Sequence, residues 1–170
     1  MTEVSAPALR PAREDDVETI ATLWHSGWRD GHVGHVPDAL LPHRGLDDFR
    51  RRVPPRIPET TVATIDGQVV GFVTVREDEV EQVYVSAAAR GTGVAATLMR
   101  HAEQVIARRF DVAWLSVAVG NARARRFYER SGWSDAAALD YRAEIEGGTL
   151  PVPCRRYEKQ VRSLGAAPRS

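Results

Sequence analysis

The segment TTVATIDGQVVGFVTV, residues 60–75, constrains the fold more than any other part of the chain. Two β-branched runs flank Asp66-Gly67, the residue pair that a two-residue hairpin turn prefers. A second turn at REDE, residues 76–79, leads into another apolar run, VEQVYV, residues 80–85. Strands joined by such short turns pair antiparallel, so we expect the middle of the chain to form an antiparallel meander.

The segments around this meander predict further strands and several helices. We expect a helix with Asp15 as its N-cap and Glu18 completing a capping box, because apolar residues follow at helical spacing as far as Trp28. The other expected elements are a first strand at 8–12, a short helix at 46–52, a long helix from 94 to about 109, a buried strand at 111–119, a helix at 121–132 closed by glycine, and a last hairpin turning at 147–148. This order predicts an α+β fold with a mixed, mostly antiparallel sheet.

Length and composition indicate an ordinary globular protein. The 170 residues predict a single domain over residues 6–161, with flexible tails at 1–5 and 162–170. The 23 basic and 23 acidic residues cancel, so we expect neither nucleic acid nor a membrane as a partner. A single cysteine, Cys154, excludes an internal disulfide, and no apolar run reaches membrane-spanning length. Both features favour a cytoplasmic location.

The stretch AARGTGVAATL, residues 88–98, places bare backbone between the last strand of the meander and the long helix. Unpaired N–H groups at a helix start, with glycines that let a ligand approach closely, are typical of a phosphate cradle. A tight turn that needs glycine only for its conformation is the alternative. The same residues also match the dinucleotide fingerprint G-x-G-x-x-A, but its first glycine lies too far from the strand end, and the preceding strand belongs to an antiparallel meander.

Read as R-x-x-G-x-A, the stretch resembles the pyrophosphate loop of the GNAT superfamily of acyl-CoA-dependent N-acetyltransferases. The resemblance extends from about Leu9 to Val161 and is most specific over residues 79–133. EVEQVYVSAAARGTGVAATLM is similar to the fourth strand, loop and third helix of the family. LSVAVGNARARRFYERSGW is similar to its fifth strand and the N-x-x-A-x-x-F-Y-x-x-x-G-[FW] segment that follows.

The resemblance implies a GNAT-like fold in which the fourth and fifth strands splay apart, with flanking helices, and acetyl-CoA as the co-substrate. Backbone amides of the loop would hold the pyrophosphate of coenzyme A, and the pantetheine arm would lie against the fourth strand. The cofactor-binding residues implied in this way are Val83, Tyr84, Val85, Arg90, Gly91, Thr92, Gly93, Val94, Ala95 and Asn121.

The resemblance also implies direct attack of a primary amine on the thioester. A backbone N–H near Val83 would stabilise the oxyanion, and Tyr128 would protonate the leaving thiolate, although an aromatic at this place can also be a core residue. Glu79 and Glu81 point to one face of their strand in an alternating pattern. We expect Glu81 to be the base, with Glu79 in reserve; a charged, solvated strand face is the alternative.

The acceptor is expected to be a small-molecule or peptide amine, framed by the loop Trp28–Arg44 and the hairpin segment Glu144–Cys154. Trp24, Trp28 and Tyr141 are either pocket or core residues. His32, His35 and His43 have no metal-ligand spacing of useful specificity, so we expect a solvated loop and no metal. A non-catalytic acyl-CoA-binding module is the alternative function, and a homodimer is a possible assembly.

Overall fold

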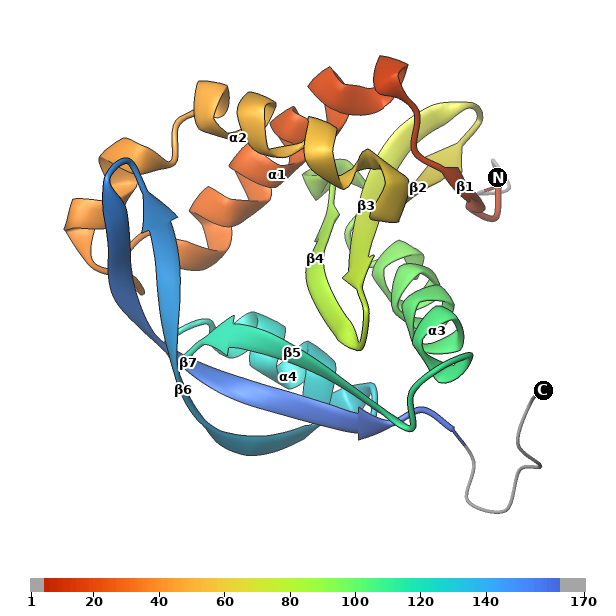
Figure 1. The fold of residues 1–170 in the computed structure, drawn as a ribbon. Coiled ribbons are helices and arrows are strands. Elements are labelled where there is room, and N and C mark those ends of the chain that lie inside the picture. The colour runs from red at the N-terminus through yellow and green to blue at the C-terminus, as the bar shows by residue number, and fades with distance from the viewer. Residues whose placement is uncertain (1–4, 163–170) are drawn as a thin grey trace.

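The computed structural model describes residues 5–162 and arranges them as a seven-stranded mixed sheet with helices on both faces (Figure 1). The strands are β1 (Ala8–Pro11), β2 (Thr60–Ile65), β3 (Gln68–Arg76), β4 (Glu79–Val85), β5 (Val112–Ala118), β6 (Ser134–Ile145) and β7 (Gly148–Gln160). The α-helices are α1 (Val17–His32), α2 (Leu46–Arg52), α3 (Val94–Ala107) and α4 (Ala122–Arg130). These elements confirm the predicted α+β class.

The strand order is β1-β2-β3-β4-β5-β7-β6, and every neighbouring pair is antiparallel except β4–β5. The predicted meander is therefore present as β2, β3 and β4. Its first turn has Asp66 at φ 51° and Gly67 at φ 81°, the left-handed pair that a type I′ hairpin turn requires. The parallel β4–β5 pair is connected through α3, which makes this crossover the single βαβ unit of the described chain.

Two hydrophobic cores lie on opposite faces of the sheet. Helices α1 and α2 cover one face, where Ile20, Trp24 and Phe49 pack against Phe72 of β3. Helix α3 covers the other face, where Leu98 and its helical neighbours pack with residues of β3, β5 and β7. Helix α3 turns an apolar face to this core, because Val94, Leu98, Ala102 and Ile106 are all buried. The cores hold both halves of the sheet together from either side.

The start of α1 differs from the prediction. A 3-10 turn, Glu14–Asp16, precedes α1, and Asp16 rather than Asp15 makes the side-chain contacts there. Its carboxylate accepts a hydrogen bond from the Arg13 N–H at 2.8 Å and pairs with Arg10 at 2.8 Å. The prediction of Asp15 as the cap was wrong. Arg10 on β1 pairs with Asp16 instead, and this tertiary contact is not encoded in any capping pattern.

The segment after α1 is also more ordered than expected. Helix α1 continues to His32, and the 3-10 helices Asp38–His43 and Pro54–Glu59 flank α2. The long β6–β7 hairpin, turning at Gly147-Gly148 as predicted, reaches the α1–α2 connection at one end of the molecule (Figure 1). Two distant parts of the chain therefore meet beside α1.

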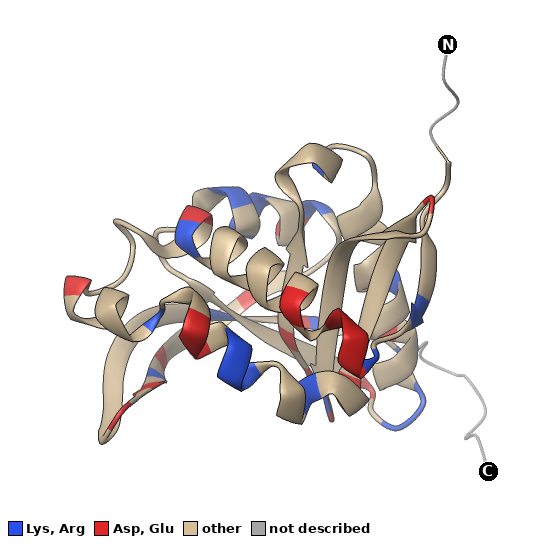
Figure 2. Ribbon diagram, turned by 90° about the horizontal axis from the view of Figure 1, so that it is seen from above, with Lys and Arg blue, Asp and Glu red and all other residues tan. Residues whose placement is uncertain are grey.

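Charged residues of both signs are interspersed along the ribbon in the view of Figure 2. Within residues 5–162, no helix combines the length and the apolar character needed to cross a membrane. The tails predicted at 1–5 and 162–170 lie outside the described residues, apart from Ser5 and Arg162.

Candidate active site

The parallel strands β4 and β5 separate almost as soon as they meet (Figure 1). Glu79 and Trp114 form the only residue pair between them in the described chain, although each strand has seven residues. Beyond this pair the two strands diverge, so the sheet has an internal pair of open edges. Unpaired edges of this kind present free N–H and C=O groups to a ligand.

The hydrogen-bond pattern of β4 shows which of its backbone groups are free. The Ser86 N–H donates to the Val70 carbonyl at 2.8 Å, and hydrogen-bonded pairs alternate along an antiparallel ladder. Because every second residue of β4 bonds to β3, the backbone groups of Tyr84, two residues before Ser86, point to β3. Those of Val83 and Val85 point toward β5. These are the two residues whose backbone was expected to meet the pantetheine arm.

The same alternation applies to the opposite edge. The Val119 N–H donates to the Pro153 carbonyl of the neighbouring strand β7 at 3.2 Å. Ser116 and Ala118 therefore turn their backbone groups toward β4. Two open backbone edges thus face each other across the diverging strands.

A cleft of about 530 Å³ occupies this space and continues toward the β6–β7 hairpin. With one exception, it is lined by every site residue expected from the sequence: Glu79, Glu81, Val83, Tyr84, Val85, Arg90, Gly91, Gly93, Val94, Ala95, Asn121 and Tyr128. The exception is Thr92, whose hydroxyl and N–H both donate to the Ala89 carbonyl. The structure therefore gathers residues of β4, the glycine loop, the start of α3 and α4 around one cavity.

The glycine loop supplies unpaired donors at one end of the cleft. Gly91 and Gly93 have φ angles of 78° and 86°, and a Cβ added at either would meet no atom within 4 Å. Gly93 is the N-cap of α3 and offers no side-chain cap. In this loop and the first turn of α3, five backbone N–H groups have no hydrogen-bond partner among residues 5–162: those of Gly91, Gly93, Val94, Ala95 and Ala96. Such a cluster at the positive end of a helix is suited to a phosphate.

Helix α1 approaches the cleft closely at two glycines. A Cβ on Gly27 would lie 2.3 Å from the Tyr84 ring, and one on Gly31 would lie 2.8 Å from Nδ2 of Asn121. Asn121 is the N-cap of α4, where its Oδ1 accepts a hydrogen bond from the Ala124 N–H at 3.2 Å. Its amide is thus fixed at the junction of β5, α4 and α1.

Tyr128 lies in the cleft wall within an aromatic group. Its ring lies 5.5 Å from that of Phe127 and 6.2 Å from that of Tyr157. The hydroxyl makes no hydrogen bond within the described chain, and burial raises the pKa of Tyr128 to about 12. Tyr157, by contrast, donates its hydroxyl to Glu129 at 2.9 Å and accepts from Arg125. Tyr128 therefore keeps a free phenol proton at neutral pH.

The two glutamates of β4 differ in their surroundings. The register of β4 against β3 shifts so that Gln82 and Val80 are paired while Glu81 is not, which makes Glu81 the extra residue of a β-bulge. Both oxygens of Glu81 are occupied, since Arg56 donates to Oε1 and Arg76 donates to Oε2 at 3.0 Å. Glu81 is thus held as an ion-paired carboxylate.

Glu79 makes no ion pair or hydrogen bond within the described chain through its side chain. Burial, and after it the nearby charge of Glu81, raise the pKa of Glu79 to about 7. A carboxyl group with this pKa exchanges its proton near neutral pH, which is the property that a general acid or base needs.

Comparison with protein families agrees with this geometry. A model described as the acetyltransferase (GNAT) family matches residues 18–133, more than half of the chain. The chain belongs to the GNAT acetyltransferase family. No curated protein matches the sequence.

Solved structures of GNAT proteins share the fold over nearly the whole chain. A GCN5-related N-acetyltransferase from Rhodopseudomonas palustris is 22% identical, with a TM-score of 0.68, and 96% of this chain and 99% of that one are covered. PaiA N-acetyltransferase from Thermoplasma acidophilum, in complex with coenzyme A, is 16% identical with a TM-score of 0.71, over 92% and 99%. A ribosomal-protein-alanine N-acetyltransferase from Brucella melitensis is 20% identical with a TM-score of 0.66, over 90% and 99%.

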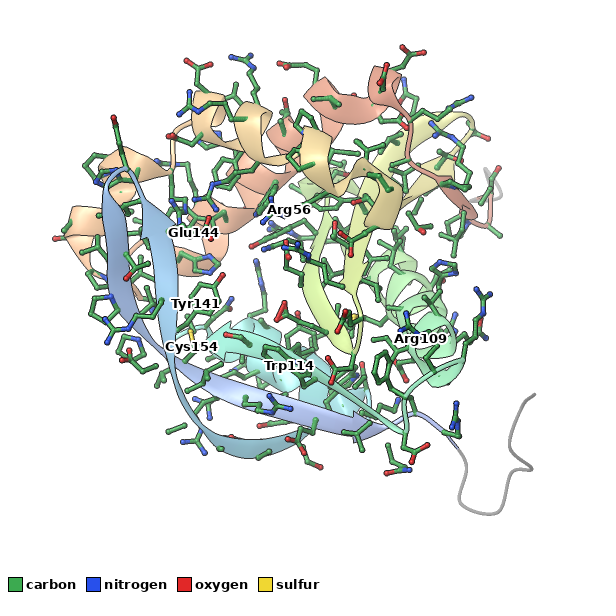
Figure 3. All side chains as sticks on the ribbon, in the orientation of Figure 1. Arg56, Arg109, Trp114, Tyr141, Glu144 and Cys154 are labelled. Carbon is green, nitrogen blue, oxygen red and sulfur yellow. The ribbon has the colours of Figure 1, made fainter. Side chains whose placement is uncertain are left out.

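The end of the GNAT cleft nearest the hairpin contains residues that the sequence did not indicate. Arg44 and Arg52 line it together with His32, and Tyr141 lines it from β6. Figure 3 shows Tyr141 and Cys154 on the hairpin side and Arg56 on the side of the 3-10 helix Pro54–Glu59. The expected loop and hairpin do frame this end, and Arg44 is the last residue of that loop. Neither arginine belongs to a motif, however, so the sequence did not single out either one.

The histidines of the α1–α2 connection do not form a metal site. No group of three or more His, Cys, Asp or Glu side chains in residues 5–162 is arranged to hold a metal ion. His32 instead stacks on Trp28, and its Nδ1 lies 2.8 Å from the Trp28 carbonyl, which can only accept. Burial lowers the pKa of His32 to about 4. This imidazole is therefore neutral at pH 7, with its proton on Nδ1.

Proposed function

We propose that the protein is an acetyl-CoA-dependent N-acetyltransferase that acts on a primary amine of a small molecule or peptide. One observation carries the proposal: a single cleft joins unpaired helix-start amides, two open strand edges, a free tyrosine hydroxyl and an unpaired glutamate. Membership of the GNAT family gives the same reaction class. The cleft supplies groups for both binding and chemistry.

The cleft fits coenzyme A by the chemistry of its donors. The loop amides of Gly91 and Gly93 and the first amides of α3 would receive the pyrophosphate, with no side chain in the way. The backbone groups of Val83 and Val85 would pair with the amides of the pantetheine arm, and Asn121 would meet the arm from the other side. When bound, acetyl-CoA supplies the thioester carbon that the amine attacks.

We assign the base to Glu79 in preference to Glu81. An amine reacts only after it has lost its ammonium proton, so the base must be able to accept a proton near neutral pH. The pKa of Glu79 is raised to about 7, whereas both oxygens of Glu81 already accept hydrogen bonds from arginines. In this assignment Glu81 acts on Glu79 through its charge.

The remaining two roles belong to Val83 and Tyr128. The N–H of Val83, turned into the cleft, would stabilise the negative charge that develops on the thioester oxygen. Tyr128 would donate its proton as a hydrogen bond to the departing sulfur. Because a thiol has a pKa of about 8.5 and that of Tyr128 is raised to about 12, hydrogen-bond donation contributes more than complete transfer of the proton.

The test is the pH dependence of thiol release from acetyl-CoA with a panel of primary amines. We expect the wild-type rate to rise through an inflection near pH 7, where Glu79 loses its proton. Glu79→Gln should lower the rate at pH 7 by about 10- to 100-fold and should regain part of it as the pH approaches the pKa of the amine.

Glu81→Gln is the matched control. Removing its charge lowers the pKa of Glu79, so we expect the inflection to move to lower pH with a smaller loss of rate. A larger loss in Glu81→Gln than in Glu79→Gln would transfer the role of base to Glu81. Coenzyme binding without thiol release from any amine would instead indicate a non-catalytic acyl-CoA-binding module.

A further inference from the structure

Arg44 is a buried arginine without an acidic partner. Its side chain lines the cleft, and the residue is only 5% exposed. Its one hydrogen bond goes from Nη1 to the neighbouring His43 carbonyl at 2.9 Å, and no carboxylate of the described chain lies within ion-pair distance. A buried charge without a counter-charge is strongly destabilising, so this arrangement calls for a ligand that completes it.

Arg52 extends the same positive wall. It also lines the cleft, and its Nη2 donates only to the Glu144 backbone carbonyl, at 3.0 Å. Burial lowers the pKa of both guanidinium groups, and the charge of Arg52 lowers that of Arg44 further. Two carboxylates act on both arginines through their charge, Glu144 and Asp48. Glu144 is exposed and forms no ion pair with either arginine, and Asp48 is itself held by Arg51 and by the Gly45 N–H. Two cations therefore face the cleft with donors to spare.

The negative end of the same region is Glu79. Tyr141 lines the same cleft and is near enough to feel both signs: the charges of Glu79 and Glu81 add to burial in raising its pKa, and those of Arg52 and Arg44 lower it. Glu81 is neutralised by its arginines, which leaves Glu79 as the free carboxylate beside the reacting centre. Among the described residues that line the acceptor end of the cleft, Glu79 is thus the free anionic group, and Arg44 and Arg52 are a pair of free cationic groups.

These arginines lie away from the phosphate-binding end. Arg56 donates from Nη1 to the Arg52 carbonyl at 2.8 Å and from Nε to Glu81, so the pair is next to the start of β4. The glycine loop follows the other end of that strand, and seven residues of strand span about 20 Å. The pyrophosphate and the arginine pair therefore belong to different ends of the cavity.

We propose that the acceptor is an amine that also carries a carboxylate, held by Arg44 and Arg52, with its ammonium directed to Glu79. The proposal rests on the acetyltransferase function above. Guanidinium groups bind carboxylates with paired hydrogen bonds, and no part of a simple alkylamine would satisfy them. In the reaction the ammonium gives one proton to Glu79, the nitrogen forms a bond to the acetyl carbon, and the carbon–sulfur bond breaks. The nitrogen then loses its second proton, which balances the proton that the departing thiolate takes up.

The experiment compares each amino acid with its own carboxamide. The panel contains the standard amino acids and straight-chain ω-amino acids, each paired with the amide in which an uncharged group of similar shape replaces the carboxylate. Both kcat/KM for thiol release and the rise in Tm with coenzyme A present are measured. The amide's amine is less basic and so is more often unprotonated, which means that a preference for the carboxylate cannot come from the amine.

We expect at least one carboxylate-bearing amine to be preferred over its amide by about 30-fold or more, because the amide leaves the buried arginines unpaired. Arg44→Met should reduce that ratio to within about threefold of unity and should abolish the selective rise in Tm. Arg100→Met is the control: it removes an exposed arginine on α3 that does not line the cleft, and it should leave the ratio unchanged.

The outcomes separate the two proposals. Thiol release that is as fast with amides as with carboxylates would overturn the carboxylate site and leave the acetyltransferase intact. A ratio unchanged in Arg44→Met would also overturn it. Selective stabilisation by carboxylate-bearing amines without thiol release would support the site and overturn catalysis. If no carboxylate-bearing amine of the panel reacts or stabilises, the carboxylate site is overturned.

Discussion

The two ends of the cleft are lined by different chemical groups. At the glycine loop the wall consists of backbone, with N–H groups of Gly91, Gly93 and the first turn of α3 left bare. Toward the hairpin the wall consists of side chains, among them the charged groups of Glu79, Arg44 and Arg52. A backbone wall suits one constant ligand, whereas a wall of side chains can be exchanged without altering the fold. The contrast therefore divides the part of the site that suits a shared coenzyme from the part that selects an individual acceptor.

The largest effect is expected at the backbone end. Gly93→Val places a branched side chain in the open space above the loop and at a φ of 86°. We expect coenzyme A affinity to fall by about 100-fold or more, equivalent to about 2.8 kcal/mol. Titration calorimetry with coenzyme A measures this directly.

Gly67→Val is the matched control for that change. Gly67 has a φ of 81° and an equally open surrounding, but it belongs to the β2–β3 turn. Backbone strain should therefore lower Tm in both variants, while coenzyme affinity falls only in Gly93→Val. Equal affinities in the two variants would show that the loop does not hold the coenzyme.

An effect confined to turnover is expected between the two ends. Tyr128→Phe keeps the ring and removes the hydroxyl, so kcat should fall by roughly 10- to 1000-fold with nearly unchanged coenzyme affinity. Tyr157→Phe makes the same change one ring away, where the hydroxyl is bound to Glu129 and Arg125. It should lower Tm and spare kcat. If kcat is unchanged in Tyr128→Phe while chemistry limits the rate, Tyr128 is a packing residue.

The smallest effect is one of stability at the acceptor end. The pKa of Glu79 is raised from its ordinary value to about 7, so the folded state loses stability as the pH rises through this range. Glu79→Gln should therefore raise Tm at pH 8 by about 2–4 °C, the shift that about 1 kcal/mol gives in a domain of this size. The difference should disappear below pH 4.5.

Asp16→Asn should change Tm at pH 8 in the opposite direction to Glu79→Gln. Hydrogen bonds from Arg10 and Arg13 lower the pKa of Asp16, so its contribution is present above the ordinary pKa and is lost as the pH falls. This variant should lower Tm at pH 8 and approach the wild type in acid. If Glu79→Gln and Asp16→Asn changed Tm at pH 8 in the same direction, the assignment of Glu79 to catalysis and Asp16 to stability would be contradicted.

The coenzyme end could be predicted from the sequence because its residues are consecutive. The glycine loop, the strand before it and the helix after it lie within residues 79–107, so local spacing carries most of their geometry. The meander and the Asp66-Gly67 turn were predictable for the same reason. Asn121 and Tyr128 came from a second short motif.

The acceptor end could not be predicted in this way, because its residues come from segments far apart in the chain. Arg44 and Arg52 meet Tyr141 and Glu79 only once the β6–β7 hairpin has folded against α2. Strand alternation places Glu79 and Glu81 on the same face, and Glu81 is preferred from the sequence only because its position predicts that it lies nearer the cleft. The sequence does not reveal the bulge at Glu81, because the bulge depends on the register of β4 against β3. Nor does it reveal the arginines that bind the Glu81 carboxylate, because these are tertiary contacts.

The single pair between β4 and β5 has a mechanical consequence. Glu79 and Trp114 lie at the chemical end of the cleft, so they act as a pivot for any rotation of one half of the sheet against the other. A rotation of about 10° would displace Val85, about 20 Å away along the strand, by about 3.5 Å while leaving Glu79 nearly in place. Such a rotation would widen the coenzyme end of the cleft, whereas the distance between β4 and β5 at Glu79 and Trp114 would hardly change.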